Sequence, residues 1–129
     1  MGYRIIEDGI GVSEAERLLK MTYWADRRST ETIEKSMRNS ACFGIRSDED
    51  GKLIGFARVV TDYATTWYLC DVIIDPDYRH AGLGKALVSH VVFRFAGLRG
   101  ILLTRDAHGL YEQYGFASGE GRAMIRNPG

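Results

Sequence analysis

The segment with the clearest chemical potential is a glycine-containing turn between an apolar run and a helical pattern. The run Val72–Ile74 ends before Pro76, and Arg79, Gly82 and Gly84 follow. The first N–H groups of a helix lack partners within it and the helix dipole makes that end positive, so it binds anions such as pyrophosphate. Glycines remove side chains that would block close approach. The spacing predicts a phosphate-binding turn, although glycines that only shape a tight turn would leave the same pattern.

Two well-known phosphate motifs do not match this turn. No third glycine follows at the spacing of the dinucleotide fingerprint. Lys85 follows Gly84, but the Ser or Thr that completes a P-loop is missing. Arg79, His80 and Lys85 nevertheless supply positive or hydrogen-bonding groups around the glycines.

A second candidate for chemistry is Tyr111, in the segment Leu110–Phe116. A tyrosine with a pKa near ~10 stays neutral at pH 7 and can donate a proton to a leaving group. Packing of the ring against its own short helix is the alternative role, and residue type alone favours it. The order of the two segments changes that balance.

The two segments together resemble the GNAT superfamily of N-acetyltransferases. Arg79-x-x-Gly82-x-Gly84 after an apolar strand resembles the acetyl-CoA-binding motif of that family. Tyr111, followed three residues later by a hydrophobic residue and Gly-Phe, resembles its C-terminal signature. The resemblance covers roughly residues 41–118, and it favours catalysis over packing as the role of Tyr111.

The resemblance implies roles for individual residues. Tyr111 would be the general acid that protonates the thiolate of CoA, and a main-chain N–H of the strand Val72–Ile74 would stabilise the oxyanion. Thr104 stands where relatives often carry an asparagine, and its neighbour Arg105 is an alternative phosphate contact. The residues expected to bind the cosubstrate acetyl-CoA are Val72, Ile73, Ile74, Arg79, His80, Ala81, Gly82, Leu83, Gly84, Lys85 and Thr104.

The implied reaction is direct transfer of an acetyl group to a primary amine, and we expect a small-molecule acceptor. A protein N-terminal or lysine acetyltransferase and a non-catalytic CoA-binding or sensing domain are the alternatives. The general base stays open. Regular alternation would place Tyr68, Cys70, Val72 and Ile74 on one sheet face and Asp71 on the other. Two roles then remain open for Asp71: a distant base, or a structural partner of an arginine such as Arg58. Removal of the amine proton through a chain of water molecules is the default.

The expected acceptor pocket lies at the joint between the first two helices. Tyr23, Trp24 and Arg27, together with Tyr68, would form an aromatic wall with a cationic rim. Packing of these aromatic rings on the sheet, with the arginines in solvent, is an equally supported alternative.

Composition narrows the class of protein. The 129 residues are 45% hydrophobic, with 17 basic and 17 acidic residues, which argues against a general nucleic-acid binder. No run is long enough to span a membrane, and no Cys or His spacing indicates a metal site, so we expect neither. Cys42 and Cys70 are expected to be free thiols, and the protein to be cytoplasmic.

The patterns predict a single domain over residues 1–129 with an α+β fold. Strands are expected at 3–7, 41–46, 53–60, 67–74, 101–103 and 116–125, and helices from about Ser13, from Ser29 or Thr30 to Asn39, over 82–95 and over 107–114. As in the GNAT fold, the sheet would be mixed and mostly antiparallel, with helices on both faces. The short last strand needs a partner, which makes a homodimer an open option.

Overall fold

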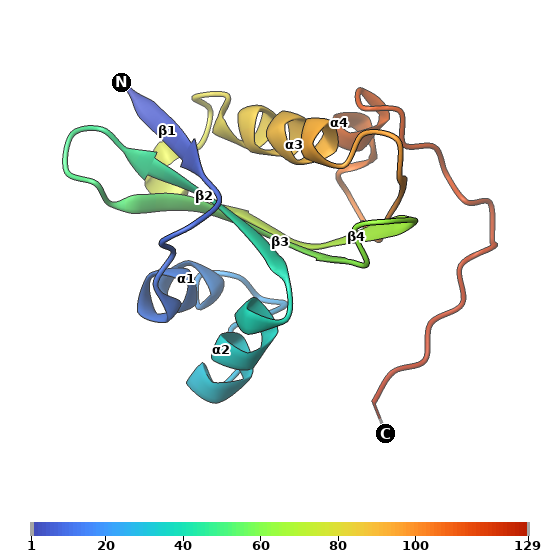
Figure 1. Cartoon of the computed structure of the whole chain (residues 1–129), viewed down its shortest axis with the longest axis horizontal. Helices are drawn as coiled ribbons and strands as arrows, with labels where there is room; N and C mark the ends of the chain where they lie inside the picture. Colours follow the sequence, from blue (N-terminus) through green and yellow to red (C-terminus); the bar gives the residue numbers. More distant parts are fainter. Residues whose placement is uncertain (1, 129) are drawn as a thin grey trace.

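The computed structural model describes residues 2–128 and contains one five-stranded sheet between two layers of helices (Figure 1). The strands lie in the order of the sequence, and only β4 and β5 are parallel. Helices α1 and α2 cover one face, and α3 and α4 lie on the other. The strands are β1 (Tyr3–Ile6), β2 (Ala41–Ser47), β3 (Leu53–Thr61), β4 (Thr66–Ile74) and β5 (Arg99–Leu102); the helices are α1 (Val12–Leu19), α2 (Thr30–Arg38), α3 (Leu83–Arg94) and α4 (His108–Glu112). The expected mixed, mostly antiparallel α+β sheet is confirmed.

Local chemistry accounts for where the first two helices begin. The Ser29 hydroxyl accepts a hydrogen bond from the Thr32 N–H at 3.1 Å, so Ser29 caps α2 as expected. The predicted cap of α1 was wrong by two residues. Its cap is Gly11, whose N–H donates to the Glu14 carboxylate at 2.9 Å, and Ser13 lies inside the helix.

Each face of the sheet carries its own apolar core. Beneath α3, Phe43 and Val59 of the sheet pack with Leu87 and Val91 of the helix, and all four are fully buried or nearly so. Beneath α1 and α2, the buried residues include Leu18, Ile33, Phe56 and Ile73. Burial of each such side chain stabilises the fold by about 1.5–3 kcal/mol. The two cores hold the sheet rigid between its helix layers.

A β-bulge interrupts β4. Arg58 of β3 lies opposite Asp71, and the next residue, Val59, lies opposite Leu69, so Cys70 is an extra residue without a partner. Leu69 before the bulge and Val72 after it therefore both face α3. The regular alternation predicted for this strand was wrong, because the bulge puts Tyr68 and Asp71 together on the α1–α2 face.

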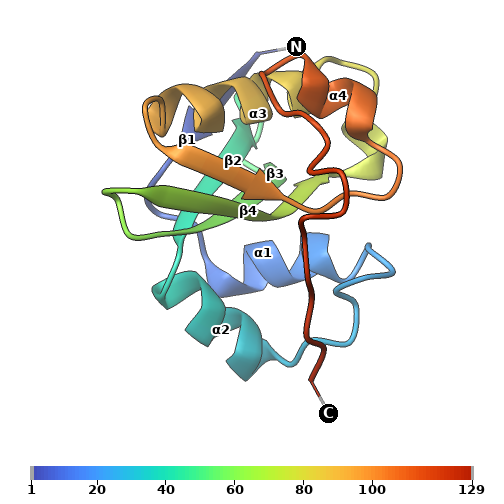
Figure 2. The same ribbon diagram turned by 90° about the vertical axis from the view of Figure 1, so that its right-hand side faces the viewer.

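The predicted last strand over 116–125 was also wrong. No strand forms there, and residues 117–128 are exposed throughout. Glu120 and Gly121 adopt left-handed φ values of 50° and 81°, which turn the chain and break an extended run. Figure 2 shows this segment crossing the open end of the sheet toward the side of α1 and α2. A strand needs a neighbour for its backbone groups, and this segment has none within the chain.

Three further expectations concern membrane spans, metal sites and cysteines. Among residues 2–128, no helix combines the length and apolarity needed to cross a bilayer. In the same range, no three His, Cys, Asp or Glu side chains cluster in a way that could hold a metal ion. Cys42 and Cys70 are both free thiols, as expected.

Candidate active site

The sheet opens where β4 and β5 separate. The two strands pair only from Thr66 opposite Arg99 to Leu69 opposite Leu102. β5 ends at Leu102, whereas β4 continues to Ile74. The β4 edge from Cys70 to Ile74 therefore has no strand on that side, and its backbone groups are free to bind an extended ligand.

The turn after β4 is anchored by a buried carboxylate. Asp75 accepts a hydrogen bond from the Asp77 N–H at 3.0 Å and pairs with Arg17 of α1 at 3.0 Å. Burial by itself would raise the pKa of Asp75, but these two partners outweigh it and the pKa is lowered. The carboxylate is therefore ionised at neutral pH and fixes the turn against α1.

Two residues of the turn adopt left-handed backbone conformations before α3 begins. His80 has φ 69°, and Gly82, the cap of α3, has φ 77°. The first hydrogen bond of the helix is donated by Ala86 to the Gly82 carbonyl, so the preceding N–H groups point outward. Arg79, His80, Ala81 and Lys85 are exposed around them, whereas the Leu83 side chain is buried in the core.

Gly84 has no structural need to be glycine. A Cβ atom there would meet only the Ile74 side chain, at an ordinary contact distance of 3.8 Å. The residue lies in the first turn of α3, where alanine is favoured over glycine. A glycine that neither backbone nor packing requires, at an anion-binding helix end, indicates close approach of a ligand.

Tyr111 of α4 stands beside the open end of the sheet. Its ring packs edge-on against Phe116 with centroids 6.0 Å apart, and Phe116 packs in the same way on Trp67 of β4 at 5.7 Å. The Tyr114 hydroxyl donates to the Lys85 carbonyl at 3.1 Å, which ties α4 to α3. Burial raises the pKa of Tyr111. The residue is thus a neutral hydroxyl with a fixed ring.

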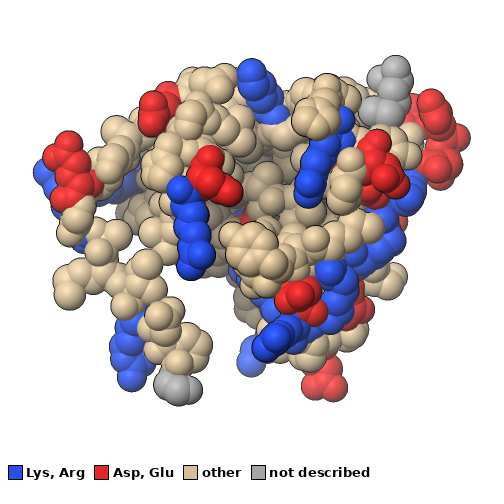
Figure 3. Space-filling model, turned by 180° about the vertical axis from the view of Figure 1, so that it is seen from behind, with Lys and Arg blue, Asp and Glu red and all other residues tan. Residues whose placement is uncertain are grey.

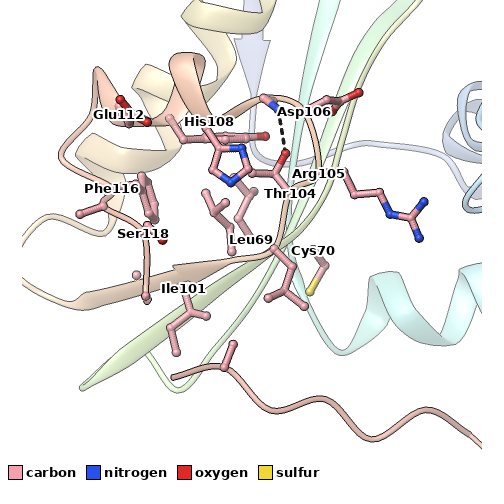
Figure 4. Close-up of a pocket in the computed structure, with 18 of the residues that line it drawn as sticks. Leu69, Cys70, Ile101, Thr104, Arg105, Asp106, His108, Glu112, Phe116 and Ser118 are labelled. Carbon is pink, nitrogen blue, oxygen red and sulfur yellow. Dashed lines mark hydrogen bonds between the residues drawn. The ribbon is translucent and has the colours of Figure 1, made fainter. Parts of the chain in front are cut away.

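A cavity of about 1120 Å³ joins Tyr111 to the joint between α1 and α2. Cys70 and Val72 of β4, Thr104, and Tyr23 and Trp24 of the joint all line it. Figure 4 shows one part of this cavity between β4, β5 and α4. On the face shown in Figure 3 the surface is hollowed near its centre, and Lys and Arg side chains lie at the border of the hollow.

The segment between β5 and α4 is held by its own hydrogen bond. Thr104 Oγ1 accepts from the Ala107 N–H at 3.1 Å (dashed in Figure 4), and its own proton remains available to a ligand. Arg105 points away from the side of the cavity that holds His108 and Phe116. His108 and Glu112 of α4 both line the cavity and are exposed.

The proposed acceptor wall is brought together only in part. Tyr23 and Trp24 line the cavity, whereas Arg27 and Tyr68 are not among its lining residues. Sequence reasoning missed that Arg28 lies 5.8 Å below the Trp24 ring and supports it. In the sequence, the only indication of that role was the position of Arg27 and Arg28 a few residues after Trp24.

Asp71 is the buried anchor of this wall. Its carboxylate, 2% exposed, accepts two hydrogen bonds from Arg28, at 2.9 and 3.2 Å. It also accepts one from Arg58 Nε at 2.7 Å. The structural ion pair with Arg58 is therefore confirmed. Asp71 is shielded from the cavity by these partners, and it ties the helix joint to the bulge of β4.

The chain is similar to known proteins in both sequence and fold. The profile described as the Acetyltransferase (GNAT) family matches residues 11–116. A protein of Xanthomonas campestris pv. campestris assigned to the GNAT family has a crystal structure that matches with a TM-score of 0.89 and 34% identity, over 99% of this chain and 94% of that one.

Two curated relatives are longer than this chain. An N-acetyltransferase of Pyropia yezoensis, ycf52, described as uncharacterized, is 29% identical over 114 residues, 83% of this chain and 65% of that protein. The histone acetyltransferase TAP1 of Glycine max is 41% identical over 93 residues, 64% of this chain and 40% of that protein. The match thus spans less than two thirds of either relative.

The profile match covers most of the chain, and it agrees with the structural match at 34% identity. The arrangement described above is consistent with both, because the open β4 edge, the start of α3 and Tyr111 border the same end of the sheet. The chain therefore belongs to the GNAT family of acetyltransferases.

Proposed function

We propose that this acetyltransferase moves the acetyl group of acetyl-CoA directly to a primary amine of a small molecule. One observation carries the proposal. The unpaired edge of β4 runs from the anion-binding start of α3 to the cavity that contains Tyr111. A long thioester with a diphosphate at one end and a reactive carbonyl at the other matches the chemistry of this path.

The residues of the path suit the parts of acetyl-CoA. The free N–H groups of Leu83, Gly84 and Lys85 would hold the pyrophosphate, with Arg79 as a nearby cation. The backbone of Val72–Ile74 would bind the amides of the pantetheine arm as a neighbouring strand does. The open space at Gly84 supports this fit, because only a glycine leaves its surface clear there.

The transfer joins the amine nitrogen to the acetyl carbon and breaks the carbon–sulfur bond. The neutral hydroxyl of Tyr111 gives its proton to the departing thiolate, and the proton that the amine loses leaves through water to restore the tyrosine. A backbone N–H of β4 near the bulge would stabilise the oxygen of the tetrahedral intermediate. Tyr111 in this position favours an enzyme over a non-catalytic CoA-binding domain, which needs no acid.

Two acceptor classes are to be compared. The cavity bounded by Tyr23 and Trp24 supports a small amine with an aromatic or other flat group. The similarity to a histone acetyltransferase of Glycine max supports a protein amine as the second candidate. Incubation with acetyl-CoA and matched panels of small amines and lysine or N-terminal peptides, read out by thiol release and product mass, separates them. Thiol release from no member of either panel would favour the binding domain instead.

The change Gly84→Ala tests the phosphate site separately from the fold. We expect the free energy of unfolding to rise by about 0.5–1 kcal/mol, because alanine is the better helix residue. We expect the KM for acetyl-CoA to rise by about tenfold, since the methyl group lies where the diphosphate must approach; that is a loss of about 1.4 kcal/mol. Gly109→Ala in α4, where the added carbon also meets open space, is the control and should leave this KM unchanged. An unchanged KM in Gly84→Ala would refute the site.

A further inference from the structure

A row of aromatic rings connects the core beneath α3 to the ring of Tyr111. Phe95, the residue after α3, stacks on Trp67 of β4 with the ring centroids 5.5 Å apart. Phe116 meets Trp67 edge-on at 5.7 Å and meets Tyr111 in the same way at 6.0 Å. Phe95 and Trp67 are each only 3% exposed, whereas Phe116 and Tyr111 are partly buried. The row therefore begins in the packed core and ends at the candidate acid.

Trp67 is held in place from three sides. Its Nε1–H donates a hydrogen bond to the Leu98 carbonyl at 3.3 Å, and its ring stacks on Phe95. Gly100 lies opposite Trp67 on β5, and a Cβ atom at Gly100 would stand 2.5 Å from the indole ring. Glycine at this position is therefore required by the indole, which fills the space where a side chain would stand. The ring gives Phe116 a rigid surface to pack on.

The helix that carries Tyr111 has little support of its own. α4 has five residues, none of which is buried, and so short a helix is not stable alone. The Tyr114 hydroxyl ties it to α3. Gly115, with φ of 88°, turns the chain back after α4, and the Phe116 N–H donates to the Tyr111 carbonyl at 3.4 Å. This turn lays the Phe116 ring against both Tyr111 and Trp67, so the direction of the Tyr111 ring depends on what stands behind Phe116.

We propose that Trp67 is a positioning residue for acetyl transfer, which acts through Phe116 to set the place of the Tyr111 hydroxyl beside the thioester sulfur. A general acid works only within hydrogen-bond reach of the atom that it protonates, and a displacement of about 1 Å can lower a rate by about 10²-fold. Trp67 is not among the residues that line the cavity, so its effect on the rate passes through Tyr111. This inference rests on the role proposed above for Tyr111 in acetyl transfer.

A double-mutant cycle with Trp67→Leu and Tyr111→Phe tests this dependence. The assay is thiol release at saturating acetyl-CoA with the panel amine that the wild type acetylates fastest. Trp67→Leu alone should lower kcat by about 10–100-fold, because leucine leaves Phe116 without its backing ring. The KM for acetyl-CoA should stay within about twofold of the wild-type value. In the Tyr111→Phe background the same change should alter kcat by less than about twofold, because no hydroxyl remains to be misplaced. Equal losses in the two backgrounds would overturn the proposal.

Two further variants keep the test decisive if the leucine variant folds poorly. Trp67→Phe retains a ring behind Phe116 and should recover most of kcat, although the hydrogen bond to Leu98 is lost. Gly100→Ala disturbs the same ring by adding a carbon, because the new Cβ atom would collide with the indole. It should lower kcat by about tenfold, again only where Tyr111 is present. A loss in Trp67→Phe as large as in Trp67→Leu, or a wild-type kcat in Gly100→Ala, contradicts the proposal.

Phe56→Leu is the control for a general loss of stability. Phe56 is fully buried in the core beneath α1 and α2, on the other face of the sheet. Its replacement should lower the midpoint of urea denaturation, as Trp67→Leu does, and leave kcat unchanged. A kcat loss in Phe56→Leu that also vanished without the Tyr111 hydroxyl would indicate a general loosening and would overturn the proposal.

The inference and the proposed function fail in different ways. Thiol release from no amine of either panel would remove acetyl transfer, and Trp67 with it. A wild-type kcat in Tyr111→Phe would remove both residues from the mechanism. A large loss in Tyr111→Phe, with an equal further loss when Trp67→Leu is added, would remove only the role of Trp67 and leave the tyrosine as the acid.

Discussion

Replacing Tyr111 with phenylalanine should lower kcat by about 10²–10⁴-fold, which is the usual contribution of a general acid. The KM for acetyl-CoA should change little, because the ring and its packing on Phe116 remain. Steady-state rates at saturating acetyl-CoA measure the effect. Because burial raises the pKa of Tyr111, the proton stays on the hydroxyl up to about pH 10. Any alkaline fall of the wild-type rate that is due to this residue should therefore have its midpoint above the ordinary tyrosine value of about 10.

Tyr114→Phe is the matched control for this experiment. Tyr114 belongs to the same segment, but its hydroxyl donates to the Lys85 carbonyl and is not among the groups that line the cavity. We expect a loss of about 0.5–1.5 kcal/mol in the free energy of unfolding and a kcat close to that of the wild type. Equal values of kcat for Tyr111→Phe and wild type would remove the tyrosine from the mechanism.

Replacing Asp71 with alanine should destabilise the fold by about 3–5 kcal/mol, because it leaves Arg28 and Arg58 partly buried without their carboxylate. The loss is a large share of the roughly 5–15 kcal/mol that holds a typical domain folded. Urea denaturation at constant pH measures this loss from the midpoint and slope of the unfolding curve.

Asp48→Ala gives the comparison for that measurement. Asp48 pairs with Arg4 at 3.1 Å, but both side chains are at least half exposed, and such a pair contributes about 0–1 kcal/mol. Asp71→Asn keeps the shape and one acceptor, so its loss should lie between the two. If Asp71→Ala lowered the free energy of unfolding no more than Asp48→Ala does, the Asp71 carboxylate would not anchor the helix joint.

The parts of the fold that sequence predicts well are those set by local patterns. Residues spaced along one helical stripe, such as Leu87 and Val91, indicate α3, and the glycines before them indicate where it starts. The predictions of a phosphate-binding turn and of a role for Tyr111 rest on local patterns in the same way, because each motif is contiguous in the sequence. The structure adds the open β4 edge that connects them.

The parts that sequence missed depend on contacts between distant residues. The bulge at Cys70 is fixed by Asp71 meeting Arg28 and Arg58, and no local rule announces that meeting. The prediction of a last strand over 116–125 failed for a different reason. Its composition suits a strand, but the left-handed φ values of Glu120 and Gly121 interrupt the extended backbone, and the segment does not pair with the free edge of β5.

The bulge also bears on how the length of this chain can vary through evolution. Loss of Cys70 itself would remove the bulge and leave the later side chains of β4 on their present faces, because Leu69 and Asp71 would then alternate regularly. Loss of a residue farther along β4, such as Val72, would instead move Ile73 and Ile74 to the opposite faces of the sheet. A codon gained or lost in the surface turn over residues 48–52 costs little by comparison. Natural length variants should therefore be found in that turn or at Cys70 and be purged from the rest of β4.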